Sequence, residues 1–208
     1  MGMDGGWAGV ALTLAVLGLY EAVLVLPRQR LAPAPARHAG LREDWLGVVS
    51  AQPGSELLAV QTLRNSLMSA TLLASTAALA LMGTATLTAP SLHDGLASPG
   101  PRLVLELVLL ALLSASLVAT LMAVRFYNHA GFVVGMPVAS PARVRWADVG
   151  VRYVRRAGVL YGVGLRQLVL VVPVIAALLA PAAGPVAAAL VVAVLVALDR
   201  FGDDAAPG

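Results

Sequence analysis

The sequence predicts an all-α membrane protein, a polytopic helical bundle with four main hydrophobic segments, the last one broken, plus one interfacial amphipathic helix. Of the 208 residues, 59% are hydrophobic and only 12% are charged, whereas soluble domains carry about 25% charged residues. The mean hydropathy is +0.86. The apolar runs are about 20 residues long, which is the length of a membrane-spanning helix. They do not alternate polar and apolar residues as the strands of a membrane barrel do.

The first hydrophobic segment covers residues 7–26 and ends at Pro27. A secretory signal peptide is the alternative interpretation. The leader carries Asp4 and no basic residue, the apolar stretch is too long, and Arg28 and Arg30 follow it directly. We therefore predict a retained membrane helix.

The second segment, residues 57–88, is predicted to follow a polar connection over 27–56. Pro53-Gly54-Ser55-Glu56 is typical of a turn before a helix, with the Ser55 side chain as the N-cap acceptor. The segment has a stripe of small and hydroxyl residues at helical spacing: Thr62, Asn65, Ser66, Ser69, Thr76, Ala80 and Gly83. Such a stripe is typical of a packing surface between helices. The alternative is a hydroxyl-lined conduit in a homo-oligomer.

The third segment, residues 103–124, is predicted to end at Arg125, and a basic connection over 125–166 follows it. Within that connection, 142–160 forms a helix with arginines on one side and small or apolar residues on the other. This helix is predicted to lie in the membrane interface and to bind anionic lipid. The residues assigned to lipid binding are Arg145, Arg152, Arg156 and Trp146.

The last segment, residues 167–198, is too long for one straight span, because about 32 residues extend about 48 Å against about 30 Å of hydrocarbon. Pro173, Pro181 and Gly184-Pro185 interrupt it. The sequence allows either one strongly kinked helix or two short helices folded as a hairpin. We treat 1–208 as a single transmembrane domain.

The arginines predict the orientation of the chain. All 14 basic residues are arginine, and twelve of them lie in 27–64 and 125–166, which the positive-inside rule assigns to the cytoplasm. We predict a protein of a bacterial inner membrane with its N-terminus outside the cytoplasm. The side of the C-terminus depends on whether the last segment crosses the membrane once or twice. Because the arginines lie beside membrane segments, they do not predict nucleic-acid binding.

Polar residues from several segments are predicted to meet at the cytoplasmic face of the membrane. They are Glu21, Gln61, Arg64, Asn65, Arg125, Asn128, His129, Arg166 and Gln167. A membrane carboxylate such as Glu21 requires a cationic neighbour, and Arg64, Arg125 and Arg166 lie at matching depth. The group either fixes the helices as a buried ion-pair network or binds an anion or a lipid headgroup. Proton coupling through Glu21 and His129 is a third alternative.

No catalytic, metal or cofactor site is predicted. The three histidines fall in different connections, and the chain has no cysteine, so no cluster of soft metal ligands forms. Nucleophile elbows and glycine-rich phosphate loops are absent from the sequence. We do not expect enzyme activity.

The stretch LAVQTLRNSLMSAT at 58–71 resembles a family of integral membrane proteins of bacteria and plants called domain of unknown function 599. Arg125-Phe126-Tyr127-Asn128 resembles the family's pattern after the third span. Arg166, Pro173, Gly184-Pro185 and Leu198-Asp199 resemble its C-terminal pattern. The resemblance covers most of the chain and singles out Gln61, Arg64, Asn65, Arg125, Asn128 and Arg166, but it implies no established activity.

The leading hypothesis is a small homo-oligomeric channel or transport protein that conducts anions. Arg64, Arg125 and Arg166 would form its cytoplasmic mouth, and the second segment would line the path. The alternative is a non-conducting scaffold or accessory subunit, which binds anionic lipid through its basic helix and a partner membrane protein through the stripe.

Overall fold

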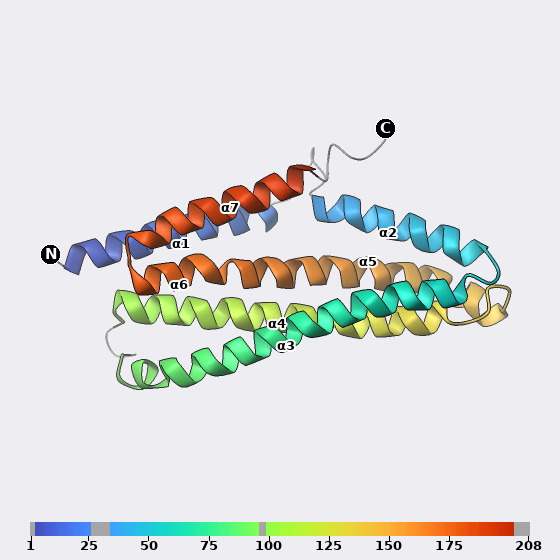
Figure 1. The fold of residues 1–208 in the computed structure, drawn as a ribbon, viewed down its shortest axis with the longest axis horizontal. Helices are drawn as coiled ribbons and strands as arrows, with labels where there is room; N and C mark the ends of the chain where they lie inside the picture. Colours follow the sequence, from blue (N-terminus) through green and yellow to red (C-terminus); the bar gives the residue numbers. More distant parts are fainter. Residues whose placement is uncertain (1–2, 26–33, 96–98, 202–208) are drawn as a thin grey trace. The chain divides into compact units, whose positions relative to one another are not determined.

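The computed structural model describes residues 3–25, 34–95 and 99–201, and these form helices without any strand (Figure 1). The helices are α1 Met3–Val25, α2 Ala34–Ala51, α3 Glu56–Gly95, α4 Pro101–Val134, α5 Pro141–Val169, α6 Val171–Leu179 and α7 Ala183–Phe201. Among the residues that the structure describes, four stretches are long and apolar enough to cross a membrane: Gly6–Leu24, Glu56–His93, Pro101–Val134 and Pro141–Leu179. Ala183–Asp199 is a shorter apolar helix. The predicted all-α membrane class is confirmed.

The chain forms two compact units. The first unit comprises Met1–Ala34, Ala77–Ser116 and Arg166–Gly208, and the second comprises Pro35–Thr76 and Leu117–Leu165. Helices α3, α4 and α5 each contribute residues to both units. Charge is divided unequally, since the sequence of the second unit has nine arginines against four acidic residues, while that of the first has five against seven.

In the first unit, α6 and α7 form a hairpin (Figure 1), and α7 also packs against α1. The chain turns at Ala180, whose backbone is extended, and the Ala183 N–H donates to the Ala180 carbonyl over 2.8 Å. The last hydrophobic segment is therefore a hairpin rather than one kinked helix. The hydrophobic core of the first unit includes Val10 and Leu17 of α1, Leu113 of α4 and Val174 of α6.

Two glycines of the first unit lie where helices approach most closely. A methyl group on Gly184 would contact the Thr13 hydroxyl and would lie 2.6 Å from the Ala177 Cβ. A methyl group on Gly9 would meet the Pro181 carbonyl group, 2.8 Å from its carbon. Glycine therefore allows α1 to pack against the α6–α7 hairpin.

The second unit has its own core, built from α2, the first half of α3, the second half of α4 and most of α5. Leu46, Leu63, Tyr127 and Val154 fill this core. Buried alanines lie between these larger side chains and allow close helix packing: Ala59, Ala70, Ala123, Ala130 and Ala157.

The turn before α3 occurs where the sequence predicts it. Gly54 has a φ of +87°, a conformation that glycine adopts readily, and α3 begins at Glu56. The predicted role of the Ser55 side chain is wrong. Its hydroxyl lies 2.7 Å from the Gln52 carbonyl and 2.5 Å from that of Val49, and donates there instead of capping α3.

The connection between α4 and α5 is held by a buried arginine. The Arg143 side chain, 3% exposed, donates to the Val133 carbonyl over 2.6 Å and to the Met136 carbonyl over 3.3 Å. These bonds satisfy carbonyls near the end of α4 that have no partner within the helix. The Glu56 carboxylate accepts the Val138 N–H over 3.0 Å.

Several predicted boundaries differ from the structure. The polar connection over 27–56 contains helix α2, and the segments over 57–88 and 103–124 continue to Gly95 and Val134. The amphipathic stretch 142–160 is the first part of α5, which runs on to Val169. Polar side chains and arginine end an apolar run without ending a helix, because arginine is a good helix former. The predicted end at residue 26 and the arginines at 28 and 30 lie outside the described residues.

Candidate functional site

A polar cluster joins three helices of the first unit. It consists of Tyr20 and Glu21 on α1, Arg166 and Gln167 on α5, and Asp199 on α7. The Arg166 Nη2 lies 2.6 Å from the Asp199 Oδ1, and the Gln167 Nε2 donates to the Glu21 Oε1 over 2.7 Å. We call these five residues the α1–α5–α7 cluster.

The α1–α5–α7 cluster brings Glu21 to the predicted neighbour Arg166, but the pairing differs from the expectation. Arg166 forms its ion pair with Asp199, whereas Glu21 receives a hydrogen bond from the neutral amide of Gln167. The Tyr20 hydroxyl is buried in the same cluster, close to Arg166. Asp199 was not predicted as a site residue. It directly follows the last predicted apolar segment, and Glu21 lies near the end of the first one.

The remaining predicted site residues belong to the second unit. Gln61, Arg64 and Asn65 are exposed on α3, and Arg125 and Asn128 are exposed on α4. Their side chains are thus available to solvent, to lipid headgroups or to a second protein.

His129 lies in an aromatic group of the second unit. Its ring centroid is 5.5 Å from that of Tyr153, which is 5.7 Å from that of Phe126. The Arg156 guanidinium carbon is 6.0 Å from the centre of the Phe126 ring, within range of a cation–π interaction. These contacts attach α4 to α5.

The exposed face of α3 is polar over several turns. Between residues 61 and 76 its exposed polar residues are Gln61, Thr62, Arg64, Asn65, Ser69, Thr71, Ser75 and Thr76. Only Met68 and Leu72 are apolar among the exposed residues of that stretch. In contrast, every exposed residue of α7 between 183 and 198 is alanine, valine or leucine. We call the exposed residues of 61–76 the α3 polar face.

The predicted stripe belongs largely to the α3 polar face. Thr62, Ser69 and Thr76 are exposed, and Ser66 is half-buried. Their hydroxyls donate to carbonyls one turn earlier in the same helix, at distances from 2.9 to 3.4 Å. The buried residues of α3 are instead Ala59, Leu63, Ala70, Ala74, Ala77 and Thr88. The stripe therefore points away from the core of its own chain.

The residues predicted to bind lipid are exposed on α5: Arg145, Trp146, Arg152 and Arg156. A depression of about 400 Å³ on the same helix is lined by Arg152, Arg155, Arg156, Val159 and Leu160. Arg155 also pairs with Glu43 of α2, with 3.4 Å between the Nε and the carboxylate oxygen. Three guanidinium groups beside two apolar side chains suit an anionic headgroup with an attached chain.

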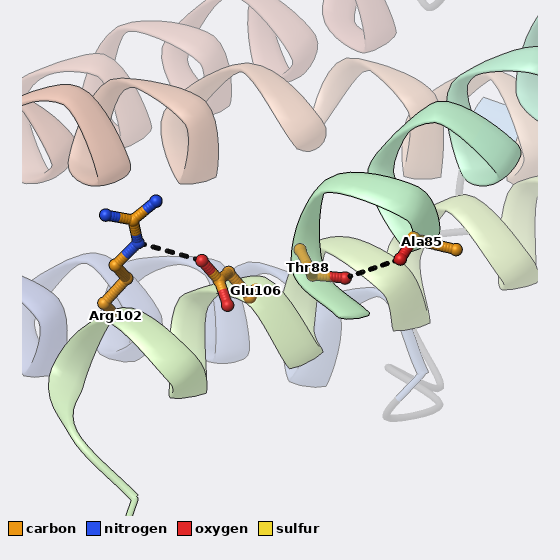
Figure 2. A network of polar contacts seen from close by, with 4 residues as sticks. All are labelled: Ala85, Thr88, Arg102 and Glu106. Atoms are coloured by element: carbon orange, nitrogen blue, oxygen red, sulfur yellow. Dashed lines mark hydrogen bonds and ion pairs between the residues drawn. The ribbon is translucent and has the colours of Figure 1, made fainter. Parts of the chain in front are cut away.

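Glu106 is a buried carboxylate in the first unit, 3% exposed. Its Oε1 accepts a hydrogen bond from Arg102 over 2.9 Å (Figure 2), whereas its Oε2 is buried without a partner among the described residues. The nearby α3 segment contributes Thr88, whose hydroxyl lies 3.5 Å from the Ala85 carbonyl. Within the described residues, no group of three or more histidine or acidic side chains could hold a metal ion.

A comparison with known families matches residues 8–203 to the family described as protein of unknown function, DUF599. No curated protein and no solved structure matches the chain.

Proposed function

The chain belongs to the family of proteins of unknown function DUF599, and we propose that it is a subunit of a small homo-oligomeric membrane channel or transport protein without catalytic activity. The protein is a multi-pass helical membrane protein. The observation that carries the proposal is the α3 polar face. A helix surface of that composition is suited to water or to another polar helix, whereas the apolar surface of α7 is suited to lipid.

A second copy of the chain is the partner that we propose for the α3 polar face. The small side chains Ser69 and Thr76 permit close approach of two helices, and their hydroxyls already have backbone partners. When several copies of α3 surround an axis, these hydroxyls line a path, and Gln61, Arg64 and Asn65 lie at its end.

The proposed selectivity of the path is for anions, with Arg64 and Arg125 at its mouth. Helix α4 has no charged residue between Glu106 and Arg125, a stretch of about 27 Å that matches about 30 Å of hydrocarbon. Arg125 then lies at the cytoplasmic boundary under the positive-inside rule in a bacterial inner membrane. The α6–α7 hairpin adds a crossing, which brings the C-terminus to the cytoplasm.

Single cysteines test the α3 polar face directly, because the natural chain has none. Purified Ser69→Cys and Thr76→Cys proteins in planar bilayers are expected to carry anion current that a charged thiol reagent blocks by about tenfold. The same variants should form disulfide-linked dimers under mild oxidation. Ala193→Cys on the lipid-suited face of α7 is the matched control, and its current should not change.

Arg64→Ala provides the second arm of this experiment, and it is expected to reduce the anion current because the mouth loses positive charge. Bilayers that stay silent at all voltages would refute the proposed function. Current that the reagent blocks equally in Ala193→Cys would refute the assignment of the path to α3.

The second candidate function is a non-conducting scaffold or accessory subunit that holds anionic lipid. The three-arginine depression on α5 supports it. Arg152→Ala and Arg156→Ala should each weaken binding of fluorescent phosphatidylglycerol in mixed micelles by about five- to tenfold at low salt, and less at high salt. Arg64→Ala is the control. Equal binding by all variants would exclude the depression as a lipid site.

A further inference from the structure

A half-open cavity of about 290 Å³ lies in the second unit. Helix α2 contributes Leu41, Arg42 and Trp45, α3 contributes Thr62, Leu63 and Ser66, and α4 and α5 contribute Tyr127 and Val154. Its volume is near the lower end for ligand pockets, which occupy about 300–1,000 Å³. The proposed path and the three-arginine depression do not include Arg42 or Trp45.

The Arg42 guanidinium packs closely against Gly158 of α5. A methyl group on Gly158 would lie 2.7 Å from the guanidinium carbon of Arg42 and 3.0 Å from its Nε. Any residue other than glycine at this position would displace the guanidinium. The two residues therefore act together to set the position of the charge at the cavity.

The charged group of the cavity is suited to an anion. Arg42 is the one charged residue among the described residues that line it. Three hydroxyl groups accompany the guanidinium, from Thr62, Ser66 and Tyr127. The Tyr127 side chain is buried, and it lines the cavity together with Arg42 and Ser66. The hydroxyls of Thr62 and Ser66 already donate to the carbonyls of Leu58 and Thr62. The guanidinium of Arg42 is therefore the group that we expect to bind a carboxylate or phosphate oxygen.

The other walls of the cavity are apolar and determine the rest of the ligand. Leu41, Trp45, Leu63 and Val154 offer hydrocarbon and aromatic surface. We propose that this cavity binds an amphiphilic anion, a carboxylate or phosphate headgroup joined to an apolar chain. Its headgroup pairs with Arg42, and the first part of its chain lies against Trp45 and Leu63. A free fatty acid and an anionic phospholipid share this chemistry.

Fluorescence of Trp45 tests the site in the full chain. Trp7→Phe and Trp146→Phe leave Trp45 as the single tryptophan, since the chain has three. In phosphatidylcholine nanodiscs, a brominated ten-carbon fatty acid should quench Trp45 saturably. Arg42→Gln is expected to weaken this binding by about tenfold or more, because a charge-assisted hydrogen bond is lost. The matched control Asp44→Asn removes an exposed charge on the same helix outside the cavity, and it should stay within about twofold of the parent.

Two further measurements extend this test. A brominated phospholipid identifies the source of the anion, and a second variant, Gly158→Ala, tests the site without removing Arg42. Quenching by phosphatidylglycerol with brominated chains, built into the nanodisc, would identify a membrane lipid, whereas quenching by the fatty acid alone would identify a free carboxylate. Gly158→Ala keeps Arg42 but displaces it, so it should also weaken binding. A brominated ten-carbon alcohol that quenches as well as the acid, or equal affinity in Arg42→Gln, Gly158→Ala and the parent, would overturn the proposal. Absence of quenching by every probe would also overturn it.

Discussion

Gly184→Ala is expected to lower the thermal unfolding midpoint of the detergent-purified protein by about 2–12 °C. The added methyl group would contact the Thr13 hydroxyl and lie 2.6 Å from the Ala177 Cβ. Thr13 and Ala177 are both buried, so neither can move aside without displacing a helix. Overpacking of this kind costs about 1–3 kcal/mol, and 1 kcal/mol shifts the midpoint by about 2–4 °C in a chain of this length.

Gly18→Ala is the matched control for Gly184→Ala. A methyl group on Gly18 of α1 meets nothing within 4 Å. Because alanine favours a helix by about 1 kcal/mol over glycine, this variant should be as stable as the parent or more stable. If both variants shifted the midpoint equally, the close approach of α7 to α1 would not be what requires glycine at position 184.

Hydropathy predicted the membrane segments well because burial in lipid requires long apolar runs. The helix ends were a different matter. Arg125 ends the apolar run of α4, yet the helix continues to Val134, because arginine fits a helix as well as leucine does. Helix α2 has no long apolar run, because His38, Arg42, Glu43 and Asp44 interrupt it. Hydropathy alone therefore did not predict this helix. The start of α3 was predictable, since Gly54 allows a turn conformation that other residues avoid.

The candidate site was predictable in part of its composition but not in its pairing. Glu21, Arg166 and Gln167 meet as expected, yet 33 residues separate Arg166 from its partner Asp199. Sequence could not choose among the carboxylates, because the choice depends on the α6–α7 hairpin. On α3, one face carries small alanines and another carries small hydroxyl residues, so spacing alone could not decide which face packs inside the chain. Arg42 was missed because its position depends on Gly158, on a helix distant in sequence.

The pairing within the α1–α5–α7 cluster predicts unequal effects for its two carboxylates. Asp199→Asn should reduce the free energy of unfolding by about 2 kcal/mol, because it removes the partner of a largely buried guanidinium. Removing one member of a fully buried pair costs about 3–5 kcal/mol, and the side chains of Arg166 and Asp199 are 16% and 30% exposed. Glu21→Gln should cost less than about 1 kcal/mol, since the partner of Glu21 is the neutral Gln167.

Thermal unfolding of both variants, and of an exchange of the two charges, measures this difference. Arg166→Asp alone should be the least stable protein, because it places two carboxylates beside Tyr20 and Glu21. Combining it with Asp199→Arg should recover at least half of the loss, since the pair is restored in reverse. A loss in Glu21→Gln as large as that in Asp199→Asn would mean that Arg166 stabilises Glu21 as well as Asp199. Because Asp199 already neutralises Arg166, replacing Arg166 should affect stability more than anion current. Arg64 is exposed, so its replacement should affect anion current more than stability.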